Sequence, residues 1–294
     1  MEQVGTEDVE RIARAVGERP FRIKWAPGHG APSNRRYLVG CRDRSVFAKV
    51  AAFDYTADWL RREHDVYLAL SGEEFLPRLV GWDDDGAHPV LVIEDLSGAT
   101  WPPPWTSAGV AAVRSSLERV HDTAVPSGLG GAEEILEDIR EGWNEVRADP
   151  EPLLRLGVCT GAWLTSHLDE LETVADAAVI EGDALVHFDV RSDNLCIRDG
   201  SAVFVDWNWA ARGDPVFDTA SWLPSLAAEG GPEPWEMLSG HGEFASLLAG
   251  FFLAHAVRPS IPQAPHVREL QEVVGRVALL WAAHALSLPL PDGG

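Results

Sequence analysis

The chain has 294 residues, 46% of them hydrophobic, and a formal net charge of -22 at pH 7. This length and apolar content suit one large globular unit or two modest lobes that share a cleft. The acidity argues against a nucleic-acid partner, because phosphate binding depends on clustered Lys and Arg, and it is compatible with a cationic substrate.

No apolar stretch approaches the ~18 to 20 residues that a membrane helix needs, and the chain starts with polar and acidic residues rather than a signal peptide. We therefore expect a cytoplasmic protein with no membrane association. Its three cysteines lack CxxC spacing. They predict neither a disulfide framework nor a zinc site.

The first part of the chain predicts an antiparallel sheet with few helices. A helix over roughly the first 20 residues comes first, with Thr6 as its N-cap. Strand patterns follow at 21–25, 35–39, 46–50, 78–82 and 89–93, and a helix at 56–70 interrupts them.

From residue 106 onward the pattern is mainly helical, with one β-hairpin over 195–206 whose turn is Asp199-Gly200. A stiff Trp-Pro-Pro-Pro-Trp connector at 101–105 precedes it. The sequence thus predicts an α+β fold with two lobes, an N-lobe over 1–96 and a mostly helical C-lobe over 97–294. The sequence pattern predicts no specific role for the last ~70 residues.

One segment carries the strongest chemical signal. His187 and Asp189 end an apolar strand, Asn194 follows five residues after that Asp, and Asp206 ends the next apolar strand. Magnesium prefers hard oxygen ligands, so Asn194 and Asp206 suit a metal while Asp189 is free to face a hydroxyl. Any one of these residues alone would equally fit a turn cap, and it is the full spacing that favours a reactive site.

A second signal lies in the N-terminal half. Lys49, one of two lysines in the chain, sits in the middle of an apolar strand, where an unpaired ammonium is costly to bury. In the following helix, Glu63 lies within an apolar stripe at helical spacing. An inward lysine and an inward carboxylate predict an ion pair, with a purely structural salt bridge as the alternative.

Together these motifs resemble the aminoglycoside phosphotransferase family of the kinase-like superfamily, which shares a His-x-Asp-x-x-x-x-Asn loop and a metal-binding Asp downstream. The resemblance implies that Asp189 is the catalytic Asp that orients the acceptor hydroxyl and takes its proton. It implies Asn194 and Asp206 as Mg²⁺ ligands, and Arg191 as the cation that neutralises developing charge. Asp218 would brace the catalytic loop.

The same resemblance implies a nucleotide site in the N-lobe. Lys49 would pair with Glu63 and touch the α and β phosphates. The loop over 26–34, with Ser33 and Asn34, would cover the nucleotide, and the backbone of Glu94 and Leu96 would meet the base. The chain has no GxxxxGK[ST] motif, which excludes a P-loop kinase.

The implied reaction is transfer of the γ-phosphoryl of ATP or GTP, with Mg²⁺, to a hydroxyl of a small molecule such as an aminoglycoside or another antibiotic, with a role in antibiotic resistance. The alternatives are a metabolic kinase for an amino sugar, sugar or amino alcohol, and a catalytically silent nucleotide-binding member. The oligomeric state does not follow from the sequence. Candidates for an acidic acceptor end are Glu133, Glu134, Glu137, Asp138, Glu233 and Glu236.

Overall fold

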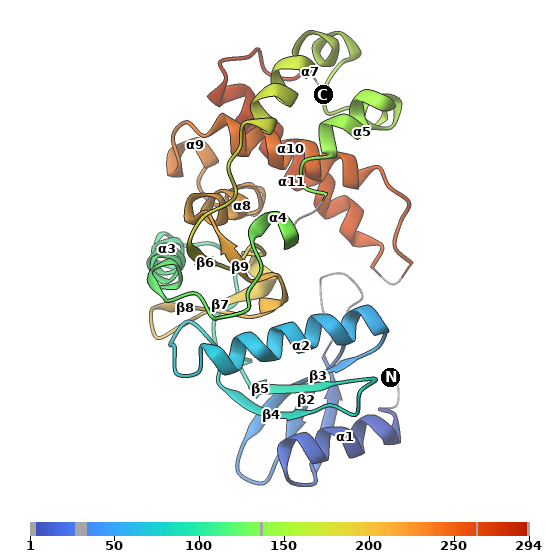
Figure 1. The fold of residues 1–294 in the computed structure, drawn as a ribbon, viewed down its shortest axis with the longest axis vertical. Coiled ribbons are helices and arrows are strands. Elements are labelled where there is room, and N and C mark those ends of the chain that lie inside the picture. Colours follow the sequence, from blue (N-terminus) through green and yellow to red (C-terminus); the bar gives the residue numbers. More distant parts are fainter. Residues whose placement is uncertain (1–3, 27–33, 136–137, 263, 293–294) are drawn as a thin grey trace.

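The computed structural model describes residues 4–26, 34–135, 138–262 and 264–292 (Figure 1). Its strands are β1 (Arg22–Trp25), β2 (Asn34–Gly40), β3 (Ser45–Ala51), β4 (Leu79–Asp83), β5 (Val90–Glu94), β6 (Ala184–Val186), β7 (Leu195–Arg198), β8 (Ser201–Phe204) and β9 (Ala211–Gly213). Its α-helices are α1 (Thr6–Val16), α2 (Asp54–Ala69), α3 (Ser107–Asp122), α4 (Ala132–Ile135), α5 (Gly142–Ala148), α6 (Glu151–Arg155), α7 (Gly161–Asp176), α8 (Pro215–Ala228), α9 (Pro234–Met237), α10 (Gly242–Ala256) and α11 (His266–Ala285). Two short 3-10 helices are η1 (Ser192–Asn194) and η2 (Trp207–Trp209).

The N-terminal part is an antiparallel sheet in the order β1-β2-β3-β5-β4. Val46, Ala48 and Val50 of β3 are buried in the cluster that α1 covers. Because strand side chains alternate between faces, Lys49 points to the opposite face, the side on which α2 lies. Figure 1 shows α2 between the sheet and the helical part of the chain. The predicted α+β architecture is confirmed.

The two helices beside the sheet bury different faces of it. α1 packs Ile12 and Val16 into the cluster on one face, and α2 carries Leu60 and Glu63 inward from the other. The predicted N-cap of α1 is wrong by one residue: Gly5 is the N-cap, because its carbonyl accepts the first helical hydrogen bond, from Val9 N–H.

The predicted hairpin forms as β7 and β8. Its turn residues Asp199 and Gly200 have φ of 51° and 80°, the positive values that a tight hairpin turn requires. The apolar strand expected before the catalytic loop is β6, and it pairs with β9, a strand that the sequence analysis missed. β9 has three residues and shows no alternating pattern long enough to predict it.

The C-terminal part is helical, with α10 and α11 packed along each other (Figure 1). Gly275 of α11 allows this approach, since a Cβ there would lie 2.8 Å from the side chain of Leu253 on α10. In the described ranges, no helix is long and apolar enough to span a membrane.

Candidate active site

Asp218, a fully buried residue of α8, anchors the loop that begins at His187. Its Oδ2 accepts a hydrogen bond from His187 N–H at 3.1 Å, and its Oδ1 accepts one from Phe188 N–H at 2.8 Å. Phe188 has φ of 60°, which is uncommon for a bulky L-residue, and these bonds stabilise it. The expectation that Asp218 braces the loop is confirmed.

His121 of α3 completes this anchor, with Nε2 3.0 Å from Asp218 Oδ2. Burial acts to raise the pKa of Asp218, but the hydrogen bond and charge of His121, together with the contacts of His187, outweigh it and the pKa is lowered. Asp218 is therefore an anion at neutral pH. The sequence analysis did not identify this role of His121, because its partner is 97 residues away.

His187 links the loop to the chain just before Asp206. Its Nε2 donates to the Val205 carbonyl at 2.9 Å, and its Nδ1 accepts from Asp189 N–H at 3.2 Å. One ring nitrogen donates and the other accepts, so the imidazole is neutral. Its burial, which lowers the pKa of His187, agrees with that state.

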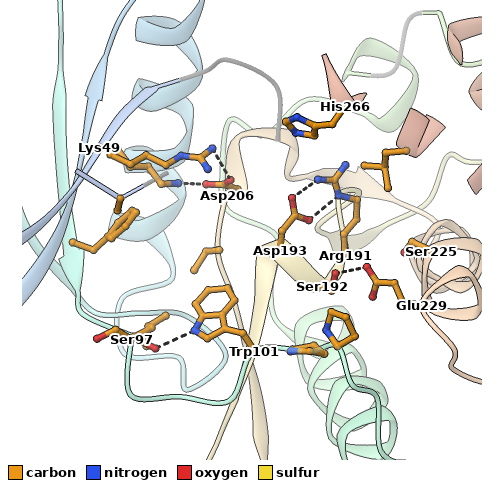
Figure 2. A pocket seen from close by; sticks show the side chains of 18 of the residues that line it. Lys49, Ser97, Trp101, Arg191, Ser192, Asp193, Asp206, Ser225, Glu229 and His266 are labelled. Atoms are coloured by element: carbon orange, nitrogen blue, oxygen red, sulfur yellow. Dashed lines mark hydrogen bonds and ion pairs between the residues drawn. The ribbon is translucent and has the colours of Figure 1, made fainter. Parts of the chain in front are cut away.

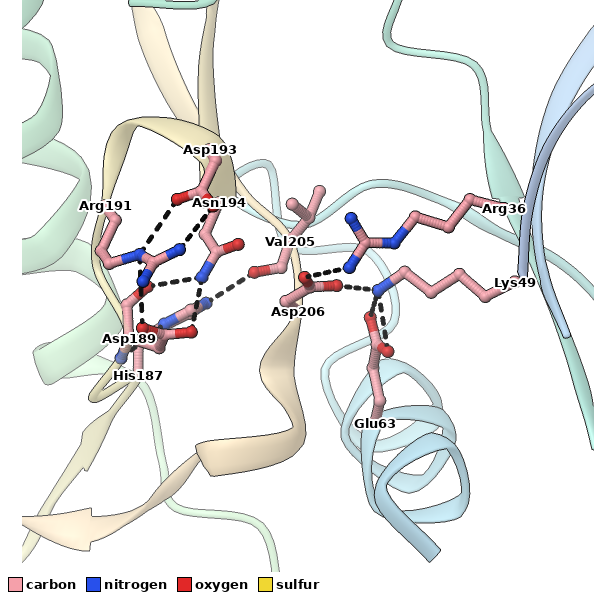
Figure 3. A network of polar contacts seen from close by, with 10 residues as sticks. All are labelled: Arg36, Lys49, Glu63, His187, Asp189, Arg191, Asp193, Asn194, Val205 and Asp206. Carbon is pink, nitrogen blue, oxygen red and sulfur yellow. Dashed lines mark hydrogen bonds and ion pairs between the residues drawn. The ribbon is translucent and has the colours of Figure 1, made fainter. Parts of the chain in front are cut away.

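Asp189 lies between Asn194 and Arg191 (Figure 3). Asn194 Nδ2 donates to Asp189 Oδ2 at 2.7 Å, and Arg191 Nε lies 3.7 Å from Oδ1. Arg191 Nε also donates to Asp193 Oδ1 at 3.0 Å. Loss of solvent raises the pKa of Asp189, while the charge of Arg191 acts against this rise. A carboxylate with a raised pKa is a better proton acceptor than an ordinary one.

Lys49 reaches from β3 to two carboxylates. Its Nζ donates to Glu63 Oε1 at 2.6 Å and Oε2 at 2.9 Å, and it also bonds Asp206 Oδ1. Burial acts to lower the pKa of Lys49, but the charges of Asp206 and Glu63 outweigh it and the pKa is raised. Lys49 therefore remains an ammonium, and the expected pair with Glu63 is present.

The loop after β8 places Asp206 beside Asn194. Asp206 has φ of 63° and ψ of 53°, a left-handed conformation that is uncommon for a non-glycine residue. The preceding Val205 N–H donates to the Asn194 carbonyl at 2.8 Å. Because the Asn194 amide nitrogen faces Asp189, its oxygen points the other way (Figure 3).

These two side chains fit a magnesium ion chemically. One or two protein oxygens, completed by water and substrate phosphates, are the usual protein share of a Mg²⁺ shell. Asn194 offers an amide oxygen and Asp206 a carboxylate. Within the described part of the chain, no group of three or more His, Cys, Asp or Glu residues is placed to hold a metal.

Arg36 is a neighbour of Asp206 that the sequence analysis missed. It lies on β2 directly opposite Lys49 on β3, and its Nη2 is 3.9 Å from Asp206 Oδ2. The signal was present in the sequence: a tight connection between the two strands, pairing Gly40 with Ser45, fixes this register.

A cavity of about 830 Å³ opens onto these groups (Figure 2). Lys49, Arg191 and Asp206 line it. Glu63 and Asp189 are not among the lining residues, but they contact two residues that are, Lys49 and Arg191 respectively. The cavity thus joins the two halves of the predicted site.

The sheet side of the cavity carries the expected base-binding residues. Glu94 and Leu96 both line it, next to the apolar side chains of Leu38, Phe47 and Ile93. The Leu96 carbonyl is already engaged, since it accepts from Ala99 N–H at 3.0 Å and Trp101 Nε1 at 3.1 Å. The expected contact with the nucleotide base would use the backbone N–H of Leu96.

Of the two candidates in the covering loop, Ser33 lies outside the described residues. Asn34 begins β2 and pairs with Ala51. Arg36 and Leu38 line the cavity on the same face of this strand, and Asn34 lies about 7 Å further along than Arg36, beyond the described lining. Asn34 is therefore not among the described residues that line the cavity, and its contact with a nucleotide stays a prediction.

The helical side of the cavity differs from the expectation. Its described acidic lining residues are Asp193, Glu229 and Glu269, and the acidic candidates proposed from the sequence are elsewhere. Glu133 pairs with Arg140, Asp138 contacts His255 and Arg258, and Glu236 caps α9 through Glu233 N–H. Glu137 lies outside the described residues. Position in the sequence does not show which carboxylates face the cavity, because this depends on how the helices pack.

Glu229 connects the catalytic loop to the connector at 101–105. It accepts hydrogen bonds from Ser192 Oγ and, at 2.8 Å, from Trp105 Nε1. One face of α11 completes this wall at helical spacing. It comprises His266, Glu269, Leu270, Val273 and Val274.

Comparison with known proteins agrees with this geometry. Residues 25–251 match the model of the phosphotransferase enzyme family, APH. No curated protein matches the sequence.

Solved structures share the fold at low identity. A thermostable mutant of aminoglycoside phosphotransferase APH(4)-Ia, in a ternary complex with AMP-PNP and hygromycin B, is 16% identical with a TM-score of 0.59, covering 93% of this chain and 99% of that chain. Choline kinase LicA from Streptococcus pneumoniae is 16% identical with a TM-score of 0.60, covering 92% and 99%. The AMP-bound spectinomycin phosphotransferase APH(9)-Ia is 11% identical with a TM-score of 0.55, covering 87% and 89%.

These likenesses show a kinase-like bilobal fold. The family match covers most of the chain, including the segments that carry Lys49, Asp189 and Asp206. The chain therefore belongs to the APH phosphotransferase enzyme family and is a phosphotransferase with a kinase-like fold.

Proposed function

We propose that this enzyme transfers the γ-phosphoryl group of ATP to a hydroxyl of an amino-bearing small molecule, with Asp189 as the residue that acts on the acceptor. The observation that carries the proposal is the junction of Lys49, Asp206 and Arg191 around one cavity, with Asp189 3.7 Å from Arg191. A nucleotide-binding lobe over 1–96 and an acceptor-binding lobe over 97–294 would meet there.

In the proposed reaction, Asp189 orients the acceptor hydroxyl and accepts its proton on a carboxylate oxygen. The acceptor oxygen forms a bond to the γ-phosphorus as the bond from that phosphorus to the bridging oxygen breaks, and ADP leaves. Arg191, 3.7 Å from Asp189, supplies positive charge near the developing transition state. Lys49, held by Glu63, positions the phosphates.

Asn194 and Asp206 would hold Mg²⁺, whose chemistry when bound is to bridge and neutralise phosphate oxygens. For the donor, we favour ATP over GTP, because the complexes named among the similar structures contain AMP-PNP and AMP. The adenine would lie between the apolar side chains of Leu38 and Phe47 and the backbone of 94–96. A cytoplasmic location would give access to ATP.

The acceptor end supports a cationic and partly apolar molecule. Glu229 receives hydrogen bonds from the neutral donors Ser192 and Trp105, so its negative charge remains available to an ammonium group. Leu270 and Val273 of α11 add an apolar surface. An aminoglycoside or another amino-bearing antibiotic would fit this chemistry, and antibiotic resistance would follow.

A second candidate is a metabolic kinase for an amino alcohol or amino sugar. The likeness to a choline kinase, at a TM-score of 0.60, supports it as strongly as the likeness to an aminoglycoside phosphotransferase at 0.59. A catalytically silent member would need the loss of an anchor residue, and all five anchors are present: Lys49, Glu63, Asp189, Asn194 and Asp206.

A panel assay tests the proposal. ADP formation from ATP and GDP formation from GTP would be followed with aminoglycosides, spectinomycin, choline, amino sugars, neutral sugars and macrolides, with phosphorus NMR to identify the product. We expect acceptor-dependent ADP release and a phosphate ester on an amino-bearing acceptor. Phosphorylation of neutral acceptors alone would refute the amine preference, and nucleotide binding without transfer to any acceptor would favour the silent alternative.

A further inference from the structure

Arg36 and Lys49 form a pair of cations on one face of the sheet. They are direct partners across β2 and β3, so their side chains project from the same face with Cβ atoms roughly 5 Å apart. Both line the cavity, and Figure 3 shows both side chains reaching toward Asp206.

Like charges directly opposite each other on a sheet destabilise it unless an anion lies between them. Asp206 supplies that anion here: Oδ1 bonds Lys49, and Oδ2 lies 3.9 Å from Arg36 Nη2.

We propose that Arg36 is a second phosphate-binding cation of the nucleotide site, acting beside Lys49. This inference rests on the proposed function, in which Asp206 also serves a metal. If Asp206 binds a metal ion, it attracts the two neighbouring cations, Lys49 and Arg36, less strongly. Nucleotide phosphates are anions that can then take the place of Asp206 beside them. Glu63 would still hold Lys49, and Arg36 lines the cavity beside it, where a phosphate can reach its guanidinium.

The chemistry of the side chain agrees with this role. A guanidinium presents paired N–H donors that match two phosphate oxygens, whereas an ammonium acts as a point charge. The Arg36 side chain is 17% exposed and that of Lys49 is 4% exposed, so the guanidinium is the more open of the two to a ligand in the cavity. The rival role is structural, with Arg36 only holding the loop that carries Asp206.

Calorimetric titration of Arg36→Gln with adenosine, AMP, ADP and ATP separates the two roles. A phosphate-binding residue predicts unchanged adenosine affinity and a loss of about ten- to a hundredfold for ADP and ATP, the range expected for hydrogen bonds to a charged group. Arg22→Gln, at an exposed position on β1, is the matched control and should bind every ligand as the wild type does.

An equal loss for adenosine and ATP would assign Arg36 a structural role, and an unchanged ATP affinity would also overturn the proposal. If Arg36→Gln fails to fold, Arg36→Lys provides the same comparison, with a smaller loss that still grows with the number of phosphates. Failure of the wild type to bind any nucleotide would overturn the proposed function as well. Wild-type phosphoryl transfer with an Arg36→Gln variant of normal ATP affinity would overturn the Arg36 proposal alone.

Discussion

The ring of Trp209 packs against the ring of Trp59, with centroids 5.5 Å apart. Trp59 lies one helical turn before Glu63 on α2, and Trp209 follows Asp206 by three residues. The contact therefore joins the helix that holds Lys49 from one side to the loop that holds it from the other.

We expect Trp209→Ala to loosen this junction. The free energy of unfolding should fall by about 1 kcal/mol beyond the loss of buried area, as is usual for an aromatic pair. ATP affinity should fall several-fold, because Lys49 would lose its fixed position. Denaturant unfolding and calorimetry would measure both. Trp235→Ala, which removes a ring stacked on His284 instead, should leave ATP affinity unchanged, and an equal effect of the two variants would contradict the coupling.

We expect Lys49→Arg to impair catalysis nearly as much as Lys49→Met. Lys49 Nζ donates to both oxygens of Glu63 and also bonds Asp206, and the Lys49 side chain is only 4% exposed. The planar fork of Arg cannot occupy the same point between them. Steady-state kcat/KM for ATP in both variants is the measurement. Near wild-type kinetics in Lys49→Arg would reduce Lys49 to a structural strand residue.

The pH profile should report Asp189. Its carboxylate must be deprotonated to accept a proton, and its raised pKa places the acid limb of kcat/KM above the ordinary range of an Asp. Arg191 is the group that most strongly opposes this rise, so Arg191→Gln should move the acid limb to still higher pH as well as lower the rate. If the acid limb of Arg191→Gln stays in place or moves to lower pH, the result would contradict the interaction of Arg191 with Asp189.

The site residues that could be predicted from the sequence each occupy a defined position in a local pattern. Lys49 and Glu63 were found from strand alternation and helical spacing, and Asp189 and Asn194 lie five residues apart in one loop. Arg36 required the register between two strands. Glu229 and the face of α11 required long-range packing, because Glu229 meets its partner Trp105 across 124 residues. Local patterns carry no information on such contacts.

The same reasoning explains the errors in the fold. Both Gly5 and Thr6 are acceptable at a helix start, so only the hydrogen bond from Val9 identifies the cap. β9 pairs with β6 through only three residues, and tertiary packing rather than propensity makes it a strand.

We expect Asp218→Asn to lower kcat at least tenfold while changing the affinity for ATP little. The carboxylate of Asp218 accepts from both His187 and Phe188 N–H, and an amide can replace only one of these acceptors. A loss of about 1 to 3 kcal/mol in unfolding free energy should accompany it. Asp122→Asn, an exposed change on α3, is the control. Normal turnover in Asp218→Asn would show that Asp218 does not position the catalytic loop.

The most direct test of the account is single-turnover phosphoryl transfer by Asp189→Asn, measured beside its ATP affinity. The variant should bind ATP within a few-fold of the wild type, since this carboxylate acts on the acceptor, and its transfer rate should fall by ~10² or more. Transfer above about a tenth of the wild-type rate, or a loss confined to ATP affinity, would contradict the assignment of Asp189 as the residue that accepts the hydroxyl proton.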